Sequence, residues 1–216
     1  MNTIGVVDYG MGNLHSVGKA LERVADNARV VISNDPARLA DVDRLVFPGV
    51  GAIRDCMVGL REQGLDEVIR RAAAEKPLLG VCVGMQALMR WSEENEGTDC
   101  LDLFPGEVTH FPREAVDEAS GERLKIPHMG WNQVRQAMDH PLWAGIESDS
   151  RFYFVHSYRV VAEGQSWAAG VTDYGGAFLS AVARDNIFAV QFHPEKSHDA
   201  GLALLANFAR WEGNAS

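Results

Sequence analysis

The sequence predicts an α/β fold, with a mostly parallel central sheet flanked by helices and with antiparallel strands added in the C-terminal half. Two observations predict it. In the first half, short apolar runs alternate with stretches of helical periodicity, and this β-α-β alternation implies a parallel sheet covered on both faces. In the second half, strand-like runs follow one another with turn residues between them. The length of 216 residues suits a single domain, residues 1–216.

The first half is expected to supply the parallel strands and their crossover helices. Apolar residues recur three and four positions apart from Leu14 to Val24 and again from Leu65 to Ala72, which predicts two helices. A further helix is expected to open at Met85 and to continue to Trp91. The expected strands are the apolar runs Ile4–Val7, Arg29–Ile32, Leu45–Phe47 and Leu78–Val81.

The second half is expected to add hairpins to the sheet edge and to end in a helix. Turn residues at 174–176 and 184–186 separate neighbouring strand-like runs. From Leu202 to Trp211 the apolar residues follow helical spacing, which predicts an amphipathic helix. The expected strands are Val108–Phe111, Arg151–Val161, Trp167–Thr172, Ala177–Ala183 and Ile187–Phe192.

Composition excludes several classes of protein. The net charge is −10 and no cluster of Lys and Arg forms a basic face, so nucleic acid is not an expected partner. The cysteines are Cys56, Cys82 and Cys100, an odd number without a Cys-x-x-Cys spacing, which favours a reducing cytoplasm over a disulfide framework. The N-terminus lacks a basic signal-peptide region, and no apolar run reaches the ~18 residues that span a bilayer.

Cys82 lies at the end of the fourth expected strand, in the pattern Gly80-x-Cys82-x-Gly84. This pattern is typical of a nucleophile elbow, a strained strand-to-helix turn in which glycines let backbone segments pass closely. A helix N-terminus also lowers the pKa of a thiol, and the N–H of Val83 would be free to bind an oxyanion. A buried, inert core cysteine is the equal alternative, and it is the expectation for Cys56 and Cys100.

His193 and Glu195 follow the last expected strand. Residues two apart in an extended chain point the same way, so both side chains could face one site, with Pro194 ending the ladder pairing. Glu195 would then orient the imidazole so that its other nitrogen acts on a thiol. The alternatives are a surface pair without a role and a metal site with His198. No second clustered pair supports a metal, and none is expected.

Two glycine-rich loops follow the third and the first expected strand. The loop Gly49-Val50-Gly51 could supply a second oxyanion donor, although an ordinary strand-to-helix turn is the favoured explanation when the loop is taken alone. Gly10-x-Gly12 begins a dinucleotide-binding fingerprint, but His15 stands where the third glycine or an alanine is required. No nicotinamide or other cofactor is therefore expected.

With these residues in hand, the chain closely resembles the class I (triad-type) glutamine amidotransferases over essentially its whole length. The elbow from Gly80 to Gln86 and the segment from Phe192 to Glu195 carry this resemblance. Within the class, the chain is similar to the glutaminase subunits of imidazole glycerol phosphate synthase, which act in histidine biosynthesis. The motifs for this narrower resemblance are Asp8–Leu14, Pro127–Asn132 and Lys196–Ser197.

The resemblance implies hydrolysis of L-glutamine to glutamate and ammonia. The Cys82 thiolate would attack the side-chain amide, His193 would move the protons, and Glu195 would orient His193. Backbone N–H groups of Val83 and of the Gly49-Val50-Gly51 loop would hold the oxyanion. Glu94 is placed in the substrate site by its spacing from Cys82, with Glu93 and Glu96 as alternatives. The implied substrate residues are Gln86, Glu94, His156, Ser157 and Tyr158.

The resemblance also implies a heterodimer in which ammonia passes to a (β/α)8-barrel cyclase subunit. The joint products would be imidazole glycerol phosphate and aminoimidazole carboxamide ribonucleotide. Asn13, Trp131, Asn132 and Lys196 would face the partner or gate the passage. A tryptophan beside Gly130 and Asn132 fits an interface anchor, although core burial is the default for Trp131 taken alone.

Three other hypotheses stay open at this point. One is an amidotransferase that feeds anthranilate, aminodeoxychorismate or pyridoxal phosphate synthesis, against which Lys196 and Pro127–Asn132 argue. Another is a non-enzymatic binding subunit that kept only the fold, against which the complete set of Cys82, His193 and Glu195 argues. The last is a cysteine peptidase or deglycase on a similar sheet, which its substrate range would distinguish.

Overall fold

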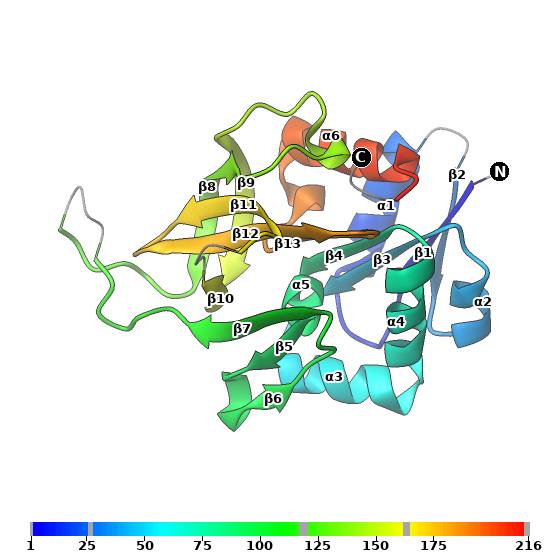
Figure 1. The fold of residues 1–216 in the computed structure, drawn as a ribbon, viewed down its shortest axis with the longest axis horizontal. Helices are drawn as coiled ribbons and strands as arrows, with labels where there is room; N and C mark the ends of the chain where they lie inside the picture. The colour runs from blue at the N-terminus through cyan, green and yellow to red at the C-terminus, as the bar shows by residue number, and fades with distance from the viewer. Residues whose placement is uncertain (1, 26–27, 117–120, 162–164, 214–216) are drawn as a thin grey trace.

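A sheet of thirteen strands runs through the computed structural model, which describes residues 2–25, 28–116, 121–161 and 165–213 (Figure 1). Five strands in the order β2-β1-β3-β4-β13 are parallel and form one half of the sheet. Their near-continuous apolar sequence suits strands that are covered on both faces. They are β1 Asn2–Val7, β2 Ala28–Ser33, β3 Arg44–Gly49, β4 Leu78–Cys82 and β13 Ile187–Val190.

Helices cover both faces of this parallel half (Figure 1). On one face, α1 (Leu14–Val24) packs beside α6 (His198–Arg210), the last helix of the chain. On the other face lie α2 (Pro36–Ala40), α3 (Ile53–Glu62) and α4 (Leu65–Glu75). Each of the longer helices buries an apolar stripe, as periodicity near 3.6 residues requires. In α1, for example, the buried stripe is Val17, Ala20 and Leu21.

Antiparallel strands extend the sheet beyond β13 and form the other half of the molecule (Figure 1). The first of them, β12 (Ala177–Arg184), pairs with β13. β12 then pairs with two branches, one through β10 and β7, the other through β11, β8 and β9. The bounds are β10 Tyr158–Val161, β7 Phe104–His110, β11 Ala168–Asp173, β8 His128–Gln136 and β9 Ser150–His156. The predicted α/β architecture with added antiparallel strands is confirmed.

Three expected elements differ from the structure. The helix expected from Met85 to Trp91 is instead a short α5 (Val83–Ala87) followed by a strand, β5 (Met89–Ser92). β5 pairs with β7 in parallel and with β6 (Thr98–Asp99) in antiparallel fashion, and this pairing overrides the local helical propensity. The strand expected over Arg151–Val161 is broken at Ser157 into β9 and β10. The last strand ends at Val190, two residues before its expected end at Phe192.

The strand β8 was also not expected from the sequence. Its side chains alternate strictly: His128, Asn132 and Val134 point inward, whereas Met129 and Trp131 are exposed. The inward residues include a histidine and an amide, so the apolar alternation that marks a strand is hidden in the sequence. β8 pairs with β9 over its length, from His128 opposite His156 to Val134 opposite Ser150.

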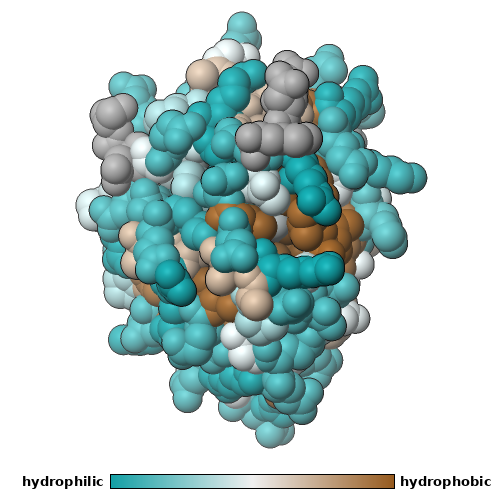
Figure 2. Space-filling model, turned by 90° about the vertical axis from the view of Figure 1, so that its right-hand side faces the viewer, coloured by the Kyte–Doolittle hydropathy of each residue, from teal (hydrophilic) through white to brown (hydrophobic). Residues whose placement is uncertain are grey.

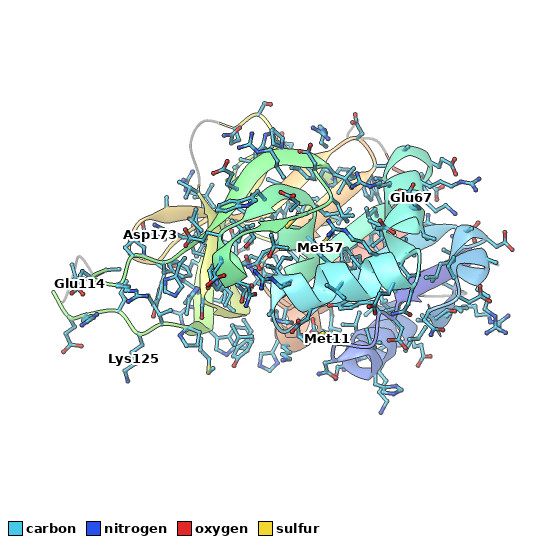
Figure 3. All side chains as sticks on the ribbon, turned by 90° about the horizontal axis from the view of Figure 1, so that it is seen from below. Met11, Met57, Glu67, Glu114, Lys125 and Asp173 are labelled. Atoms are coloured by element: carbon cyan, nitrogen blue, oxygen red, sulfur yellow. The ribbon has the colours of Figure 1, made fainter. Side chains whose placement is uncertain are left out.

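One face of the molecule, around β2 and α2, is mostly hydrophilic (Figure 2). Figure 2 shows the face around β2 and α2 covered by hydrophilic side chains, with apolar atoms visible in a few places between them. From below, Figure 3 shows α3 running under the parallel half, with Met57 on it. Glu114 and Lys125 lie at the end of the molecule opposite Glu67 of α4 (Figure 3). None of the described helices is long and apolar enough to cross a membrane.

The carboxyl ends of β3, β4 and β13 meet at one edge of the sheet. Gly49, the last residue of β3, lies beside Cys82, the last residue of β4, in parallel register. Val190 ends β13 beside Val81. The loops after these strands therefore converge, and ligands of open α/β sheets bind in such crevices. The expected elbow, glycine loop and histidine-carboxylate pair all leave the sheet here.

Candidate active site

Cys82 occupies a strained turn between β4 and α5. Its φ of 56° and ψ of −112° are unusual for a residue with a side chain, and such conformations cost about 1–3 kcal/mol. The flanking glycines make the turn possible because neighbouring backbone leaves no room for side chains. A Cβ on Gly84 would lie 2.0 Å from the carbonyl oxygen of Phe47, and one on Gly80 would lie 2.9 Å from the Cβ of Ala189. The local geometry is that of a nucleophile elbow.

His193 and Glu195 form a buried pair. Nδ1 of His193 lies 2.9 Å from Oε1 of Glu195, and both side chains are almost fully buried. The segment between them is a 3₁₀ turn, η3 (Pro194–Lys196), and not the extended chain expected from the sequence. The backbone holds the turn in place: the N–H of His193 donates to the carbonyl of Tyr153 at 2.9 Å. The hydroxyl of Ser197 donates to the carbonyl of His193 at 2.6 Å.

The surroundings of His193 favour its protonated form. Burial alone would lower the pKa of the imidazole, but the sulfur of Cys82 and the carboxylate of Glu195 outweigh burial and raise the pKa to about 10. Because Nδ1 faces Glu195, the other ring nitrogen, Nε2, is the one available to Cys82. The three side chains can therefore form an imidazolium–thiolate pair with a carboxylate behind it.

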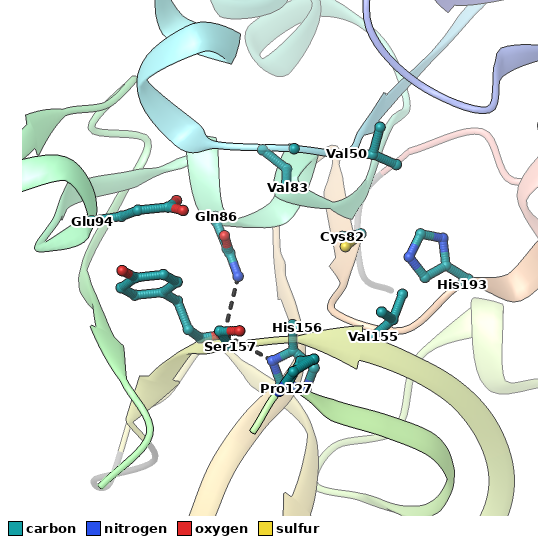
Figure 4. A pocket seen from close by; sticks show the side chains of 12 residues that line it. Val50, Cys82, Val83, Gln86, Glu94, Pro127, Val155, His156, Ser157 and His193 are labelled. Atoms are coloured by element: carbon teal, nitrogen blue, oxygen red, sulfur yellow. Dashed lines mark hydrogen bonds between the residues drawn. The ribbon is translucent and has the colours of Figure 1, made fainter. Parts of the chain in front are cut away.

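A cavity of about 340 Å³ opens in front of Cys82 (Figure 4). Cys82 and His193 lie toward one end of it, and Gln86 and Glu94 toward the other (Figure 4). Glu195 lies behind His193, outside the lining. Ten residues expected in the site line the cavity: Val50, Gly51, Cys82, Val83, Gln86, Glu94, His156, Ser157, Tyr158 and His193. Pro127 and Val155 also line it and were not expected.

A glutamine that sequence reasoning missed lies directly behind the nucleophile. Gln191 is fully buried, and its Nε2 lies 3.8 Å from the sulfur of Cys82. Its Oε1 accepts a hydrogen bond from Gln86 Nε2 at 2.9 Å, and the same Gln86 nitrogen lies 3.1 Å from the carbonyl oxygen of Tyr158. The available signal was an amide within an otherwise apolar run, Val190-Gln191-Phe192, because a buried amide needs partners.

Glu94 is the member of the acidic run that reaches the cavity. It lies in the 3₁₀ turn η1 (Glu94–Glu96), and its Oε2 accepts a hydrogen bond from the N–H of Ile53 at 3.0 Å. That N–H begins α3, so the carboxylate also holds the loop that follows Gly51. Glu93 and Glu96, the alternatives considered from the sequence, are exposed and do not line the cavity.

The glycine loop packs tightly on the elbow. A Cβ on Gly49 would lie 2.8 Å from the backbone nitrogen of Gly84 and 2.9 Å from the hydroxyl of Tyr9. Only a glycine fits between these groups. Val50 and Gly51 continue from it along the cavity wall. The loop is therefore close enough to Val83 for their backbone groups to act on the same substrate atom.

The four residues expected to face a partner lie outside the cavity. Trp131 is 43% exposed, which contradicts the default expectation of core burial for this tryptophan. Its ring stacks on His198 at 4.9 Å and meets the edge of Tyr153. The ammonium of Lys196 lies 5.9 Å from the Tyr153 ring, so Trp131 and Lys196 share one surface. Asn13 is exposed just before α1, whereas Asn132 points inward and donates to the carbonyl of Asp173.

The metal-site alternative for His193, Glu195 and His198 finds no support. Among the described residues, no three His, Cys, Asp or Glu side chains gather as metal ligands would. His198 instead stacks on Trp131. The histidine-carboxylate pair thus faces Cys82 and not a third ligand.

Comparison with known proteins identifies relatives of this chain in sequence and in fold. Residues 5–211 match the family described as glutamine amidotransferase class-I. The chain is 58% identical to imidazole glycerol phosphate synthase subunit HisH of Methylococcus capsulatus, with 98% of each chain covered. It is 55% identical to subunit HisH 1 of Pseudomonas aeruginosa, with 99% of each covered. A crystal structure of a glutamine amidotransferase shares the fold at a TM-score of 0.67 and 18% identity, covering 94% of this chain and 98% of that one.

These findings confirm the resemblance that the motifs indicated. The family match extends over almost the whole described chain, and the identity to the named subunits is spread over 213 residues. The chain belongs to the class I glutamine amidotransferase family, and within it to the family of imidazole glycerol phosphate synthase subunits HisH.

Proposed function

We propose that this chain hydrolyses L-glutamine through Cys82, His193 and Glu195 and delivers the ammonia to a cyclase subunit. The observation that carries the proposal is the strained elbow of Cys82 facing the same cavity as His193, whose Nδ1 is held 2.9 Å from Glu195. This set supplies a nucleophile, an acid-base and an orienting carboxylate.

In the first half of the reaction, the Cys82 thiolate attacks the side-chain amide carbon of glutamine. A bond forms between sulfur and carbon, and the developing oxyanion is held by the N–H of Val83 and by the loop at Gly49–Gly51. Val83 begins α5, so its N–H has no acceptor within the helix. Nε2 of His193 then gives its proton to the leaving nitrogen, the carbon–nitrogen bond breaks, and ammonia leaves a glutamyl thioester.

In the second half, water attacks the thioester. His193, now neutral, takes a proton from this water, the carbon–sulfur bond breaks, and glutamate leaves. The thiolate and the imidazolium are restored together, so one turnover consumes one water and yields one glutamate and one ammonia. The raised pKa of His193 fits its role as the proton donor for ammonia.

The far end of the cavity is suited to the amino-acid end of glutamine. Glu94 is the acidic residue among those that line the cavity, and its carboxylate would attract the α-ammonium group of glutamine. Gln86 and the backbone of the segment 156–158 offer further polar groups. Hydrogen-bonding groups of this kind discriminate glutamine from apolar side chains of similar size.

The partner is proposed from the relatives and from one exposed surface. The relatives are subunits of imidazole glycerol phosphate synthase by name. Met129 and Trp131 expose apolar surface on β8, which begins next to the cavity-lining residue Pro127, and the Tyr153 ring lies against both Trp131 and Lys196. An exposed tryptophan with a neighbouring cation is typical of an interface anchor. We infer that a (β/α)8-barrel cyclase covers this face, and that Asn13 and Asn132 lie at its border.

The joint reaction would then yield imidazole glycerol phosphate and aminoimidazole carboxamide ribonucleotide, as in histidine biosynthesis. The alternative amidotransferase pathways draw no support from the named relatives, all of which are subunits of this one synthase. Co-purification with a chorismate-using subunit or with a pyridoxal-phosphate-forming subunit would revive them.

The nucleophile assignment is tested by covalent labelling and by ammonia release. An electrophilic glutamine analogue should add its mass to Cys82 in the presence of the cyclase subunit, and Cys82→Ala should remove both labelling and ammonia release. Cys56→Ala, which changes a buried cysteine outside the cavity lining, is the matched control and should keep both. Ammonia release by Cys82→Ala would contradict the assignment, and an unlabelled Cys82 would favour a binding subunit without catalysis.

A further inference from the structure

Two buried histidines connect the surface strand β8 to the wall of the cavity. Nδ1 of His128 lies 2.9 Å from Nε2 of His156, and the other nitrogen of each ring has its own neighbour. Nε2 of His128 lies 3.3 Å from the amide nitrogen of Asn132, and Nδ1 of His156 lies 2.8 Å from the carbonyl oxygen of Tyr158. Four groups thus form one chain of three hydrogen bonds.

The two ends of this chain determine the direction of every bond in it. The Tyr158 carbonyl can only accept, so Nδ1 of His156 must carry a proton. At the other end, the Asn132 amide nitrogen donates a hydrogen bond of 2.9 Å to the carbonyl oxygen of Asp173. The Oδ1 of the same amide accepts a hydrogen bond from the N–H of Gln133. The amide orientation is therefore set, and Nε2 of His128 must be an acceptor.

Both ends require the same arrangement of protons in the middle. A neutral His128 that accepts at Nε2 carries its proton on Nδ1, and it donates this proton to Nε2 of His156. A neutral His156 with its proton on Nδ1 has its Nε2 free to accept. A positive charge on either ring would make two N–H groups face each other in this chain of hydrogen bonds. Burial also favours the neutral rings, because it lowers the pKa of His128 to about 4 and that of His156 to about 3.

Packing prevents either ring from leaving this arrangement. The His128 ring stacks on Tyr174 at 4.0 Å and on Phe154 at 4.9 Å. The His156 ring lies 5.1 Å from Phe111 and 5.2 Å from Phe178. Both histidines are more than nine-tenths buried, so an unmade bond would leave a polar atom without water.

The hydrogen-bond chain ends on a carbonyl that also holds Gln86 in the cavity wall. The carbonyl of Tyr158 accepts from His156 and also from Nε2 of Gln86 (Figure 4). Gln86 donates on to Gln191, whose own amide reaches the sulfur of Cys82. The position of the Tyr158 carbonyl therefore sets where Gln86 stands in the cavity, and His156 sets the position of that carbonyl.

We propose that His128 is a positioning residue for glutamine: its Nδ1–H holds His156 and, through His156, the Tyr158 carbonyl and Gln86. This inference rests on the proposed glutaminase function, but it concerns a residue that does not touch the cavity. Its consequence is that β8, which presents Trp131 to solvent on one side, contacts the glutamine pocket through His128 on the other.

Kinetics in the complex with the cyclase subunit test the proposal. His128→Phe keeps a ring of similar shape but removes both hydrogen bonds, and it should raise the KM for glutamine about tenfold while leaving kcat within about twofold. His128→Asn should stay near wild type because its amide can donate from the position of Nδ1. His128→Gln places its amide at the position of Nε2 instead and should behave like His128→Phe.

A second buried histidine provides the matched control. His140 also packs against aromatic rings and accepts a hydrogen bond from the N–H of Leu142, but it does not line the cavity. His140→Phe should lower the melting temperature without a change in KM. A KM that stays at the wild-type value in both His128→Phe and His128→Gln would overturn the proposal.

Nitrogen NMR of the wild-type chain gives an independent readout that does not require activity. At pH 7, His128 and His156 should both show the neutral tautomer with the proton on Nδ1. A proton on Nε2 of His128, or a charged ring, would overturn the inference even if glutamine is hydrolysed. Correct tautomers without any glutamine hydrolysis would instead contradict the proposed function and leave the hydrogen-bond chain intact.

Discussion

At the scale of single residues, the site depends on how Glu195 and Cys82 act together on His193. Burial of the imidazole works against its charge, whereas Cys82 and Glu195 both favour the charge and together raise the pKa to about 10. A proton held this firmly is available at neutral pH for a leaving amine, whereas an unperturbed histidine with a pKa near 6.5 would mostly have lost it. The pair therefore suits the proposed acid catalysis of ammonia departure.

The pH dependence of turnover follows from this pKa. The pKa of His193 is raised in the folded protein. The imidazole therefore stays protonated at neutral and mildly alkaline pH and loses its proton only near pH 10. Wild-type kcat in the complex should hold to about pH 9 and fall above it. Glu195→Gln removes one of the two causes of the rise, so its kcat should fall at a lower pH and be about 100-fold smaller at pH 7. Identical pH profiles for the two proteins would contradict the role of Glu195.

The three cysteines should differ sharply in reactivity. Burial raises the pKa of Cys56 and of Cys100 to about 12, so both remain thiols at neutral pH. Cys82 lines the cavity beside a protonated His193. Iodoacetamide at pH 7 should therefore label Cys82 in the folded chain and neither of the others, as read by peptide mass spectrometry. Faster labelling at Cys56 or Cys100 would show that the charge on His193 does not activate Cys82.

At the scale of elements, the active site is produced by the ends of β3, β4 and β13 meeting in register. Gly49 beside Cys82 brings the glycine loop against the elbow, and η3 then returns His193 toward the same edge. The close approach of β3 to α5 is possible only because Gly84 lacks a side chain. The elbow is therefore a packing constraint as well as a part of the proposed catalytic site.

Two glycine substitutions separate this packing constraint from ordinary backbone strain. Gly84→Ala would place a Cβ 2.0 Å from the Phe47 carbonyl, and we expect a loss of about 3 kcal/mol in the free energy of unfolding. Gly64 has a φ of 66° and open space around it, so Gly64→Ala should lose about 1 kcal/mol. Urea titration measures both. An equal loss in the two variants would show that β3 can move away from α5.

The elements that the sequence predicted well are those whose own residues decide their structure. The parallel strands are continuous apolar runs bounded by turn residues, and α1, α4 and α6 carry plain apolar stripes. The sequence from Met85 to Trp91 is compatible with a helix or a strand. Its second part forms the strand β5 because it pairs with β7. β8 was missed because its inward face carries His128 and Asn132, whose partners are His156 of β9 and the Asp173 carbonyl at the end of β11.

The candidate site residues also divide into those that local sequence indicated and those that depend on distant partners. Cys82, His193 and the glycine loop stand at strand ends, where sequence patterns are local and readable. Gln191 and His128 form hydrogen bonds with residues far away in the chain, so local sequence does not reveal their partners, although the amide of Gln191 within an apolar run was a signal for that residue. Motif resemblance supplied Gln86, Glu94 and the segment 156–158, and all of them line the cavity.

At the scale of the whole molecule, the antiparallel half carries an exposed surface around Trp131 of β8. Trp131, Tyr153 and Lys196 form it, with His198 stacked beneath the tryptophan. β8 and β9, which present these rings, also lead to His128 and His156. We infer that a partner bound on this surface contacts the same strands that help to shape the proposed glutamine pocket.

Removal of the exposed tryptophan tests the surface. Trp131→Ala should weaken binding of the cyclase subunit about 30-fold, because a buried aromatic anchor contributes about 2 kcal/mol to an interface. Val58→Ala changes another exposed apolar residue, on α3, and should leave the affinity unchanged. Isothermal titration gives both values. Equal affinities for the two variants would move the interface away from β8.

The most direct test of the account is ammonia release from L-glutamine by the chain alone and by the chain with its cyclase subunit and the nucleotide intermediate. A partner-dependent glutaminase that uses Cys82 predicts weak release by the isolated chain, a large gain in the loaded complex, and none with Cys82→Ala in either case. Equal release with and without the partner would contradict the dependence on a partner, and release by Cys82→Ala would contradict the site itself.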